Sequence, residues 1–144
     1  MSKVQEYLEF KKAQEKEMND FPIAYAFDKK QLDAALEQLG ATIEEVVTVF
    51  NMGDIVKKED APKYIAMLTR HTQELKDKIV EDKEFAAAAF RYEMDNHEYA
   101  INYDGDDDVL SCFGLKYDDL IELGLKAAYM TAREGHMKYA REWM

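Results

Sequence analysis

Apolar residues recur three or four positions apart along most of the chain, which is the pattern of amphipathic helices. Ser2 can cap a first helix that is expected to run to about Asn19. Asp28 and Gly40 flank the next apolar stripe as an N-terminal cap and a C-terminal stop. The pattern therefore predicts a second helix over 29–39.

Helical spacing resumes after residue 60 and continues through most of the remaining chain. Pro62 is tolerated in the first turn of a helix, and Gly114 is a natural stop. The expected elements are a helix over 61–80, a helix over 83–97, an acidic loop at 104–108, a short helix over 109–113 and a last helix from about 117 to the C-terminus.

The segment between the second and third helices has the character of β-strands. A β-branched run at 46–50, turn residues at 51–54 and an apolar pair within 55–57 predict a hairpin. Residues 42–45 have the form of a helix capping box, but strand formation is expected to prevail there. Two strands alone are marginal in water, so the hairpin is expected to pack on helices. The aromatic segment 21–27, which proline interrupts, is expected to be extended or irregular and buried.

The predicted fold class is α+β and mainly helical, with about five helices packed with one small β-hairpin. A chain of 144 residues, 47% of them hydrophobic, is long enough for one compact domain over 1–144, and no Pro- or Gly-rich linker divides it. The single cysteine, Cys112, excludes an internal disulfide framework and suits a reducing compartment. No apolar stretch resembles a signal peptide or a membrane span, so a cytoplasmic location is expected.

Negative charge is concentrated between residues 92 and 122. This segment contains ten acidic residues and one basic residue, Lys116, and so carries nine of the eleven net negative charges of the chain. Such a field repels nucleic acid and acidic membranes and favours a basic protein partner, with tyrosines as possible anchors. An acidic run can also be only a solvated face. The residues expected to bind a partner are Asp95, Glu98, Tyr99, Tyr103, Asp104, Asp106, Asp107, Asp108, Asp118 and Asp119.

No catalytic or metal-binding motif in the sequence is complete. The run Asp104–Asp108 lacks the glycine and glutamate that a calcium-binding EF-hand loop requires at its sixth and twelfth positions. Cys112 lies among acids, which raise the pKa of a thiol and disfavour a nucleophile, so a buried structural cysteine is expected. No phosphate-binding loop or serine-hydrolase motif occurs. The sequence therefore predicts that the protein is not an enzyme and uses no cofactor.

Glu93 and His97 are four residues apart, a spacing that places both on one helix face and is compatible with two ligands of a metal site. His71 and His136 could converge with them in principle. No paired-cysteine motif and no His-Glu-x-x-His motif supports such a site. The expectation is therefore that there is no metal, and that His97 closes the end of a helix, where the helix dipole favours it.

Three blocks of the sequence, at 20–27, 92–99 and 108–115, resemble a family of small acidic proteins encoded by phages and mobile elements of Firmicute bacteria. The resemblance extends over nearly the whole chain, and its most recognisable part is the Asn-His-Glu-Tyr segment at 96–99. The family is uncharacterised and offers no catalytic motif to transfer. The resemblance therefore implies a genomic setting and a bacterial host cell.

The acidic segment and the resemblance together predict a non-enzymatic inhibitor that occupies the basic groove of a nucleic-acid-binding host defence protein. Its target could be a nuclease, as for anti-CRISPR or anti-restriction proteins, with carboxylates mimicking DNA phosphates. The alternative is a structural or regulatory accessory protein of a mobile element that acts through helix packing, with homodimers possible. The small residues Ala128, Ala132 and Gly135, which share one face of the last predicted helix, motivate that alternative.

Overall fold

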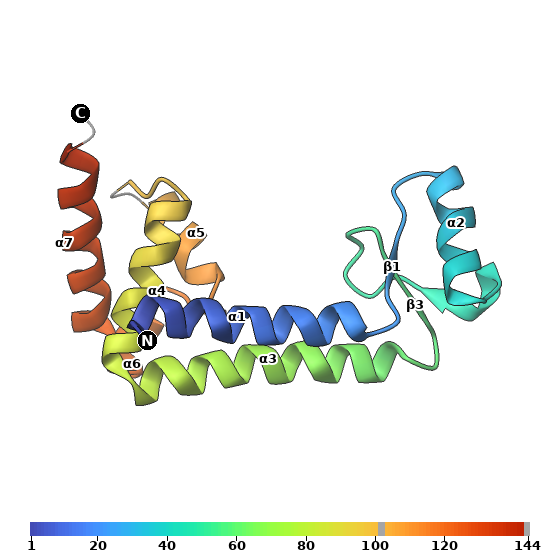
Figure 1. Ribbon diagram of the computed structural model, residues 1–144, viewed down its shortest axis with the longest axis horizontal. Helices are drawn as coiled ribbons and strands as arrows, with labels where there is room; N and C mark the ends of the chain where they lie inside the picture. The colour runs from blue at the N-terminus through green and yellow to red at the C-terminus, as the bar shows by residue number, and fades with distance from the viewer. Residues whose placement is uncertain (101–102, 143–144) are drawn as a thin grey trace. The chain divides into compact units, whose positions relative to one another are not determined.

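The computed structural model describes residues 1–100 and 103–142, without the side chains of Tyr103 and Asp104 (Figure 1). The chain forms two compact units: unit 1 consists of Met1–Lys11 and Thr72–Met144, and unit 2 of Lys12–His71. The helices described are α1 (Lys3–Asp20), α2 (Lys29–Leu39), α3 (Ala61–Glu81), α4 (Lys83–Asn96), α5 (Tyr103–Ser111), α6 (Asp119–Glu122) and α7 (Lys126–Glu142), with a 3₁₀ turn, η1 (Ile43–Glu45).

Unit 2 contains a small antiparallel sheet in the order β1-β3-β2, formed by β1 (Ala24–Tyr25), β2 (Val46–Val47) and β3 (Asp54–Lys57). Val46 pairs with Lys57 and Val47 with Val56, so the predicted hairpin is confirmed. The pairing of β1 with β3 was not predicted. The mainly helical α+β class is thus confirmed, with three strands where two were expected.

Strand β2 is shorter than the β-branched run that predicted it, because the residues after Val47 donate hydrogen bonds to the Asp54 side chain and not to a neighbouring strand. The Asp54 carboxylate accepts hydrogen bonds from the Thr48 hydroxyl at 2.9 Å and from the backbone amides of Val49 and Phe50 at 3.1 Å. A fourth hydrogen bond comes from the Met52 amide at 3.2 Å. These bonds close the hairpin loop around one carboxylate and end β2 at Val47.

Helix α2 has the predicted ends. The Asp28 side chain accepts a hydrogen bond from the Gln31 amide at 2.8 Å, and Gly40 adopts the left-handed conformation with φ of 63°. The capping box at Thr42 and Glu45 also forms, and it produces the turn η1 before β2 begins. The expectation that strand formation would displace the box was therefore wrong, since the sequence holds both elements in succession.

Replacing Asp28 with alanine is expected to destabilise the protein by about 1 kcal/mol, because the Gln31 amide loses its capping acceptor. Urea unfolding followed by far-ultraviolet circular dichroism measures this change. Asp33→Ala, an exposed position inside the same helix, is the matched control and should change stability by less than about 0.5 kcal/mol. Equal losses for the two variants would contradict the capping role.

Unit 2 has two small apolar cores. One gathers Ala24, Ala35, Leu39 and Ile55 between the sheet and α2, and the other centres on Val56, Tyr64 and Met67. The segment 21–27 is extended at β1, as predicted, but it is not buried throughout. Tyr25 is 52% exposed, because alternate side chains of a strand point away from the core, and Phe27, which lies beyond β1, is 76% exposed.

Unit 1 is built on the packing of α4 against α7 (Figure 1). Phe90 of α4 is fully buried and makes edge-to-face contacts with Phe113 and Tyr129 at centroid distances of 4.9 and 5.3 Å. The small-residue face of α7 lies in this interior: Ala128 and Ala132 are buried, and a Cβ atom at Gly135 would lie 2.6 Å from the Arg91 guanidinium. That face is therefore used within the unit.

The C-terminal third departs from prediction in two places. The expected acidic loop at 104–108 lies in α5, which ends at Ser111, because Val109 and Leu110 are fully buried and draw the segment into the core. The expected last helix is split into α6 and α7, since Gly124 adopts φ of 70° between them. These differences give seven α-helices in the described part of the chain, where about five were expected.

Within the residues described, no helix has both the length and the apolar character that crossing a membrane requires.

Candidate functional site

Two of the acids predicted to bind a partner are engaged inside unit 1. Asp95 accepts from the Arg91 guanidinium at 3.1 Å, and an Oδ1 atom of Asp95 lies 2.6 Å from Nδ1 of His136. Asp106 accepts hydrogen bonds from the hydroxyls of Tyr99 and Tyr129. Tyr99 is only 5% exposed, so its ring supports the fold and does not form a surface anchor.

Other predicted acids face solvent. Glu98, Asp107, Asp108 and Asp118 are exposed, and their side chains form no ion pair with any residue that the structure describes. Asp119 is half-buried and accepts a hydrogen bond from the Lys116 amide at 2.8 Å. The side chains of Tyr103 and Asp104 lie outside the described residues.

A hollow of about 600 Å³ lies beside two of these exposed acids. Asp107, in the middle of α5, and Asp118, just before α6, both line it, although eleven positions separate them in the sequence. The remaining lining comes from Ser111, Gly114, Leu115, Lys116 and Tyr117. The hollow therefore combines two carboxylates that form no ion pair within the described residues, one lysine, and apolar and aromatic surface, and the excess of negative charge suits a basic side chain.

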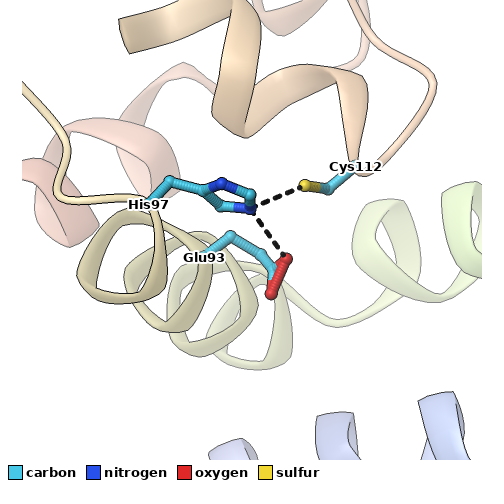
Figure 2. A group of neighbouring side chains, drawn as sticks. All are labelled: Glu93, His97 and Cys112. Carbon is cyan, nitrogen blue, oxygen red and sulfur yellow. Dashed lines mark hydrogen bonds and ion pairs between the residues drawn. The ribbon is translucent and has the colours of Figure 1, made fainter.

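A second group of side chains, not predicted as a unit, meets at the end of α4. Figure 2 shows two side chains that point toward Cys112, the first residue after α5. They are Glu93, in α4, and His97, the C-terminal cap of α4. The Nε2 atom of His97 lies 3.5 Å from Sγ of Cys112 and 3.9 Å from Oε2 of Glu93. His97 does end α4, as the sequence predicted.

The two sides of this cluster differ in their surroundings. Glu93 is 2% exposed, and its Oε1 atom forms an ion pair with Lys11 Nζ at 3.3 Å. Burial, together with the charge of Glu93, raises the pKa of the Cys112 thiol to about 11. The direction of this shift agrees with the prediction, although burial contributes more than the acidic surroundings do. Cys112 is half-buried, where a buried structural cysteine was expected.

A nucleophilic triad does not fit this geometry. In such a triad one imidazole nitrogen faces the nucleophile and the other faces the carboxylate. Here Sγ of Cys112 and Oε2 of Glu93 both face the same atom, Nε2 of His97. The raised pKa of the thiol also keeps Cys112 protonated near neutral pH, which opposes attack by a thiolate.

The other two histidines, His136 and His71, each contact different residues and do not join this cluster. His136 bonds Asp95 and, through Nε2, the carbonyl of Tyr99 at 3.0 Å. His71, in unit 2, lies 2.8 Å from a Glu17 carboxylate oxygen. Of the groups considered from the sequence, Glu93 and His97 come together, and Cys112 is the partner that sequence reasoning missed. Its place inside a predicted short helix over 109–113 gave no direct sign of that contact.

Comparison with known proteins gives one family. No curated protein and no solved structure matches the chain. A family model described as a family of unknown function, DUF7659, matches residues 6–132, which include residues of both units and all three members of the Glu93, His97 and Cys112 cluster. The expected origin in phages or mobile elements stays a prediction. The chain belongs to the DUF7659 family of unknown function.

Proposed function

We propose that the protein binds a basic, nucleic-acid-binding protein through the acidic surface of unit 1 and so competes with nucleic acid for that partner. The observation that supports this function is the hollow between α5 and α6, which Asp107 and Asp118 line with Asp108 exposed nearby in sequence. These three residues, which we call the acidic rim, form no ion pair with any residue that the structure describes.

The free state of these carboxylates matters for the mechanism. Asp95 is paired with Arg91 and contacts His136, and the Asp106 carboxylate accepts hydrogen bonds from two tyrosine hydroxyls, so both side chains are already engaged within unit 1. The acidic rim keeps its charge exposed in the unbound protein. Lysines and arginines that would otherwise neutralise DNA phosphates can pair with it, and that competition weakens as salt concentration rises.

The narrower form of the proposal is an anti-defence role. The resemblance described above suggests a mobile element, and the basic partner would then be a host defence nuclease of the CRISPR or restriction type. The protein would act as a non-enzymatic inhibitor that occupies the nucleic-acid-binding groove. Mimicry of DNA here requires only that carboxylates meet basic side chains at spacings that phosphates also satisfy.

The test compares two variants of equal charge. Asp107→Lys/Asp108→Lys/Asp118→Lys reverses the acidic rim, and Asp33→Lys/Glu37→Lys/Glu44→Lys reverses three exposed acids of unit 2. Each substitution changes the formal charge by two units, so three of them take the net charge from −11 to −5 in both variants. Basic proteins captured from bacterial lysate at low salt are identified, and displacement of labelled DNA from each is then measured.

The acidic-rim variant is expected to displace DNA at least about tenfold less well than the wild-type protein, which corresponds to about 1.4 kcal/mol. The unit 2 variant should stay close to the wild type, since its charge change lies elsewhere. Equal weakening by both variants would show that only net charge matters. Displacement that is unchanged by reversal of the rim, or capture that high salt does not release, would overturn the proposed function.

The accessory-protein alternative rested on the small-residue face of the last helix. Ala128 and Ala132 of that face are buried by packing within unit 1 and are not offered to a second copy. The alternative stays a prediction, and no described contact favours it. A concentration-independent dimer, measured by light scattering, would support this alternative.

A further inference from the structure

Three donor atoms of different chemistry converge beside the end of α4 (Figure 2). They are Oε2 of Glu93, Nε2 of His97 and Sγ of Cys112, and one donor atom from each residue lies within 4.8 Å of the other two. We propose that these residues bind a divalent cation of the zinc class, with water in the fourth position. The inference is independent of the proposed partner binding.

The spacing of the donors fits such an ion. Zinc lies about 2.0 to 2.3 Å from its ligands, so two ligands of a tetrahedral ion are separated by roughly 3.6 Å. The distances from Nε2 of His97 are 3.5 Å to Sγ of Cys112 and 3.9 Å to Oε2 of Glu93. Both donors face the same nitrogen atom, which is the arrangement expected when all three surround one common centre.

The kind of donor selects the kind of ion. Calcium and magnesium take oxygen ligands, and a thiol and an imidazole suit neither. One sulfur, one nitrogen and one carboxylate oxygen match zinc and its close relatives. Three protein ligands also leave one tetrahedral position open, and the His97 side chain, 40% exposed, places that position within reach of solvent.

The surrounding structure holds each donor in place. Glu93 and His97 are four residues apart on α4 and its cap, so they share one helix face. Lys11 Nζ pairs with Oε1 of Glu93 and leaves Oε2 directed toward the cluster, as an outer-shell partner of a ligating carboxylate does. Cys112 lies two positions after Leu110, whose full burial holds the last turn of α5 in the core.

The experiment titrates the purified full-length protein with Zn²⁺ by calorimetry and with Co²⁺ by absorption spectroscopy. One equivalent of zinc is expected to bind in the micromolar range or tighter. Bound cobalt is expected to show a sulfur-to-cobalt charge-transfer band in the near ultraviolet, because a thiolate ligand produces that band. Unfolding temperature should rise when zinc is added.

Cys112→Ser and His97→Gln test the assignment, and both positions are exposed enough that the variants are expected to fold. Losing an outer-shell partner costs about 10- to 100-fold in metal affinity, so losing a direct ligand should cost at least about 100-fold. Cys112→Ser should also lose the cobalt band. Circular dichroism verifies the fold of each variant.

Two controls separate this site from diffuse binding to acids. Glu98→Gln removes a carboxylate one residue beyond His97, and Asp107→Asn/Asp108→Asn removes two exposed carboxylates of α5. Both should bind zinc as the wild-type protein does. The proposal is overturned if the wild type binds no zinc, if Cys112→Ser and His97→Gln bind it normally, or if the α5 variant alone loses it.

Discussion

Replacing Asp106 with alanine is expected to destabilise the protein by about 3 kcal/mol, whereas the same replacement at Asp107 should change stability by less than about 0.5 kcal/mol. The two residues are neighbours in one acidic run and have the same chemistry. Their surroundings differ, because the Asp106 carboxylate accepts hydrogen bonds from Tyr99 and Tyr129, while Asp107 faces solvent.

The expected loss comes from the hydroxyl groups left behind. Tyr129 is fully buried and Tyr99 is 5% exposed, so neither hydroxyl gains full access to water when the carboxylate is removed. A hydrogen bond to a charged group contributes about 1.5 to 3 kcal/mol, and a buried donor without an acceptor costs a comparable amount. Burial and the bond to Asp106 also raise the pKa of both tyrosines, so they remain donors at neutral pH.

Urea unfolding of both variants, followed by circular dichroism, measures this difference. Asp106→Asn keeps one acceptor oxygen in place and should lose about half as much stability as Asp106→Ala. Near-ultraviolet circular dichroism reports the packing of the tyrosines and should change for Asp106→Ala only. Similar stability for Asp106→Ala and Asp107→Ala would show that the two tyrosine hydrogen bonds do not support unit 1.

The features that the sequence predicted correctly depend on neighbouring residues. Asp28 and Gly40 define the ends of α2 through bonds that reach no more than a few positions along the chain. Ser2 likewise accepts from the Gln5 amide at the start of α1, at 3.2 Å. Such signals depend on local backbone geometry, and tertiary structure rarely overrides them.

The features that were missed depend on distant residues. Five residues with four aspartates look like a loop by composition, yet α5 forms there because Tyr99 and Tyr129 bind Asp106 and the core accepts Val109 and Leu110. Strand β1 exists only through its pairing with β3, thirty residues away. The sequence shows neither contact, since both depend on the folded arrangement.

The candidate sites divide in the same way. The concentration of charge in 92–122 was visible in the sequence, but which carboxylates stay free depends on partners such as Arg91 and His136. The spacing of Glu93 and His97 was visible as well. The third member of that cluster was not visible, because Cys112 lies fifteen positions beyond His97 in the chain although its Sγ atom is 3.5 Å from the His97 ring.

Replacing Asp54 with alanine is expected to destabilise unit 2 by about 3 kcal/mol, because one buried carboxylate organises the whole hairpin loop. Asp54 is 2% exposed and accepts hydrogen bonds from the Thr48 hydroxyl and from three backbone amides between Val49 and Met52. Removing the acceptor leaves several donors without partners. Asp54→Asn should lose somewhat less, since one oxygen remains.

The same carboxylate predicts a specific dependence on pH. Burial alone would raise the pKa of Asp54, but the hydrogen bonds from Met52, Phe50, Thr48 and Val49 outweigh burial and lower it below the ordinary value of 3.8. A lowered pKa in the folded state means that the carboxylate contributes stability above pH 3.8. That contribution is lost as pH falls from there through the folded-state pKa.

Urea unfolding of the wild-type protein and of Asp54→Asn, repeated at a series of pH values, tests this linkage. The stability difference between them should be constant from neutral pH down to about pH 5 and should shrink below about pH 4. Asp33→Asn, an exposed position in unit 2, should show no such trend. A stability difference between the wild type and Asp54→Asn that stays constant to the lowest pH would contradict this role. Protonation of the Asp54 carboxylate would then cost the wild type no stability, so its charge would not hold the loop.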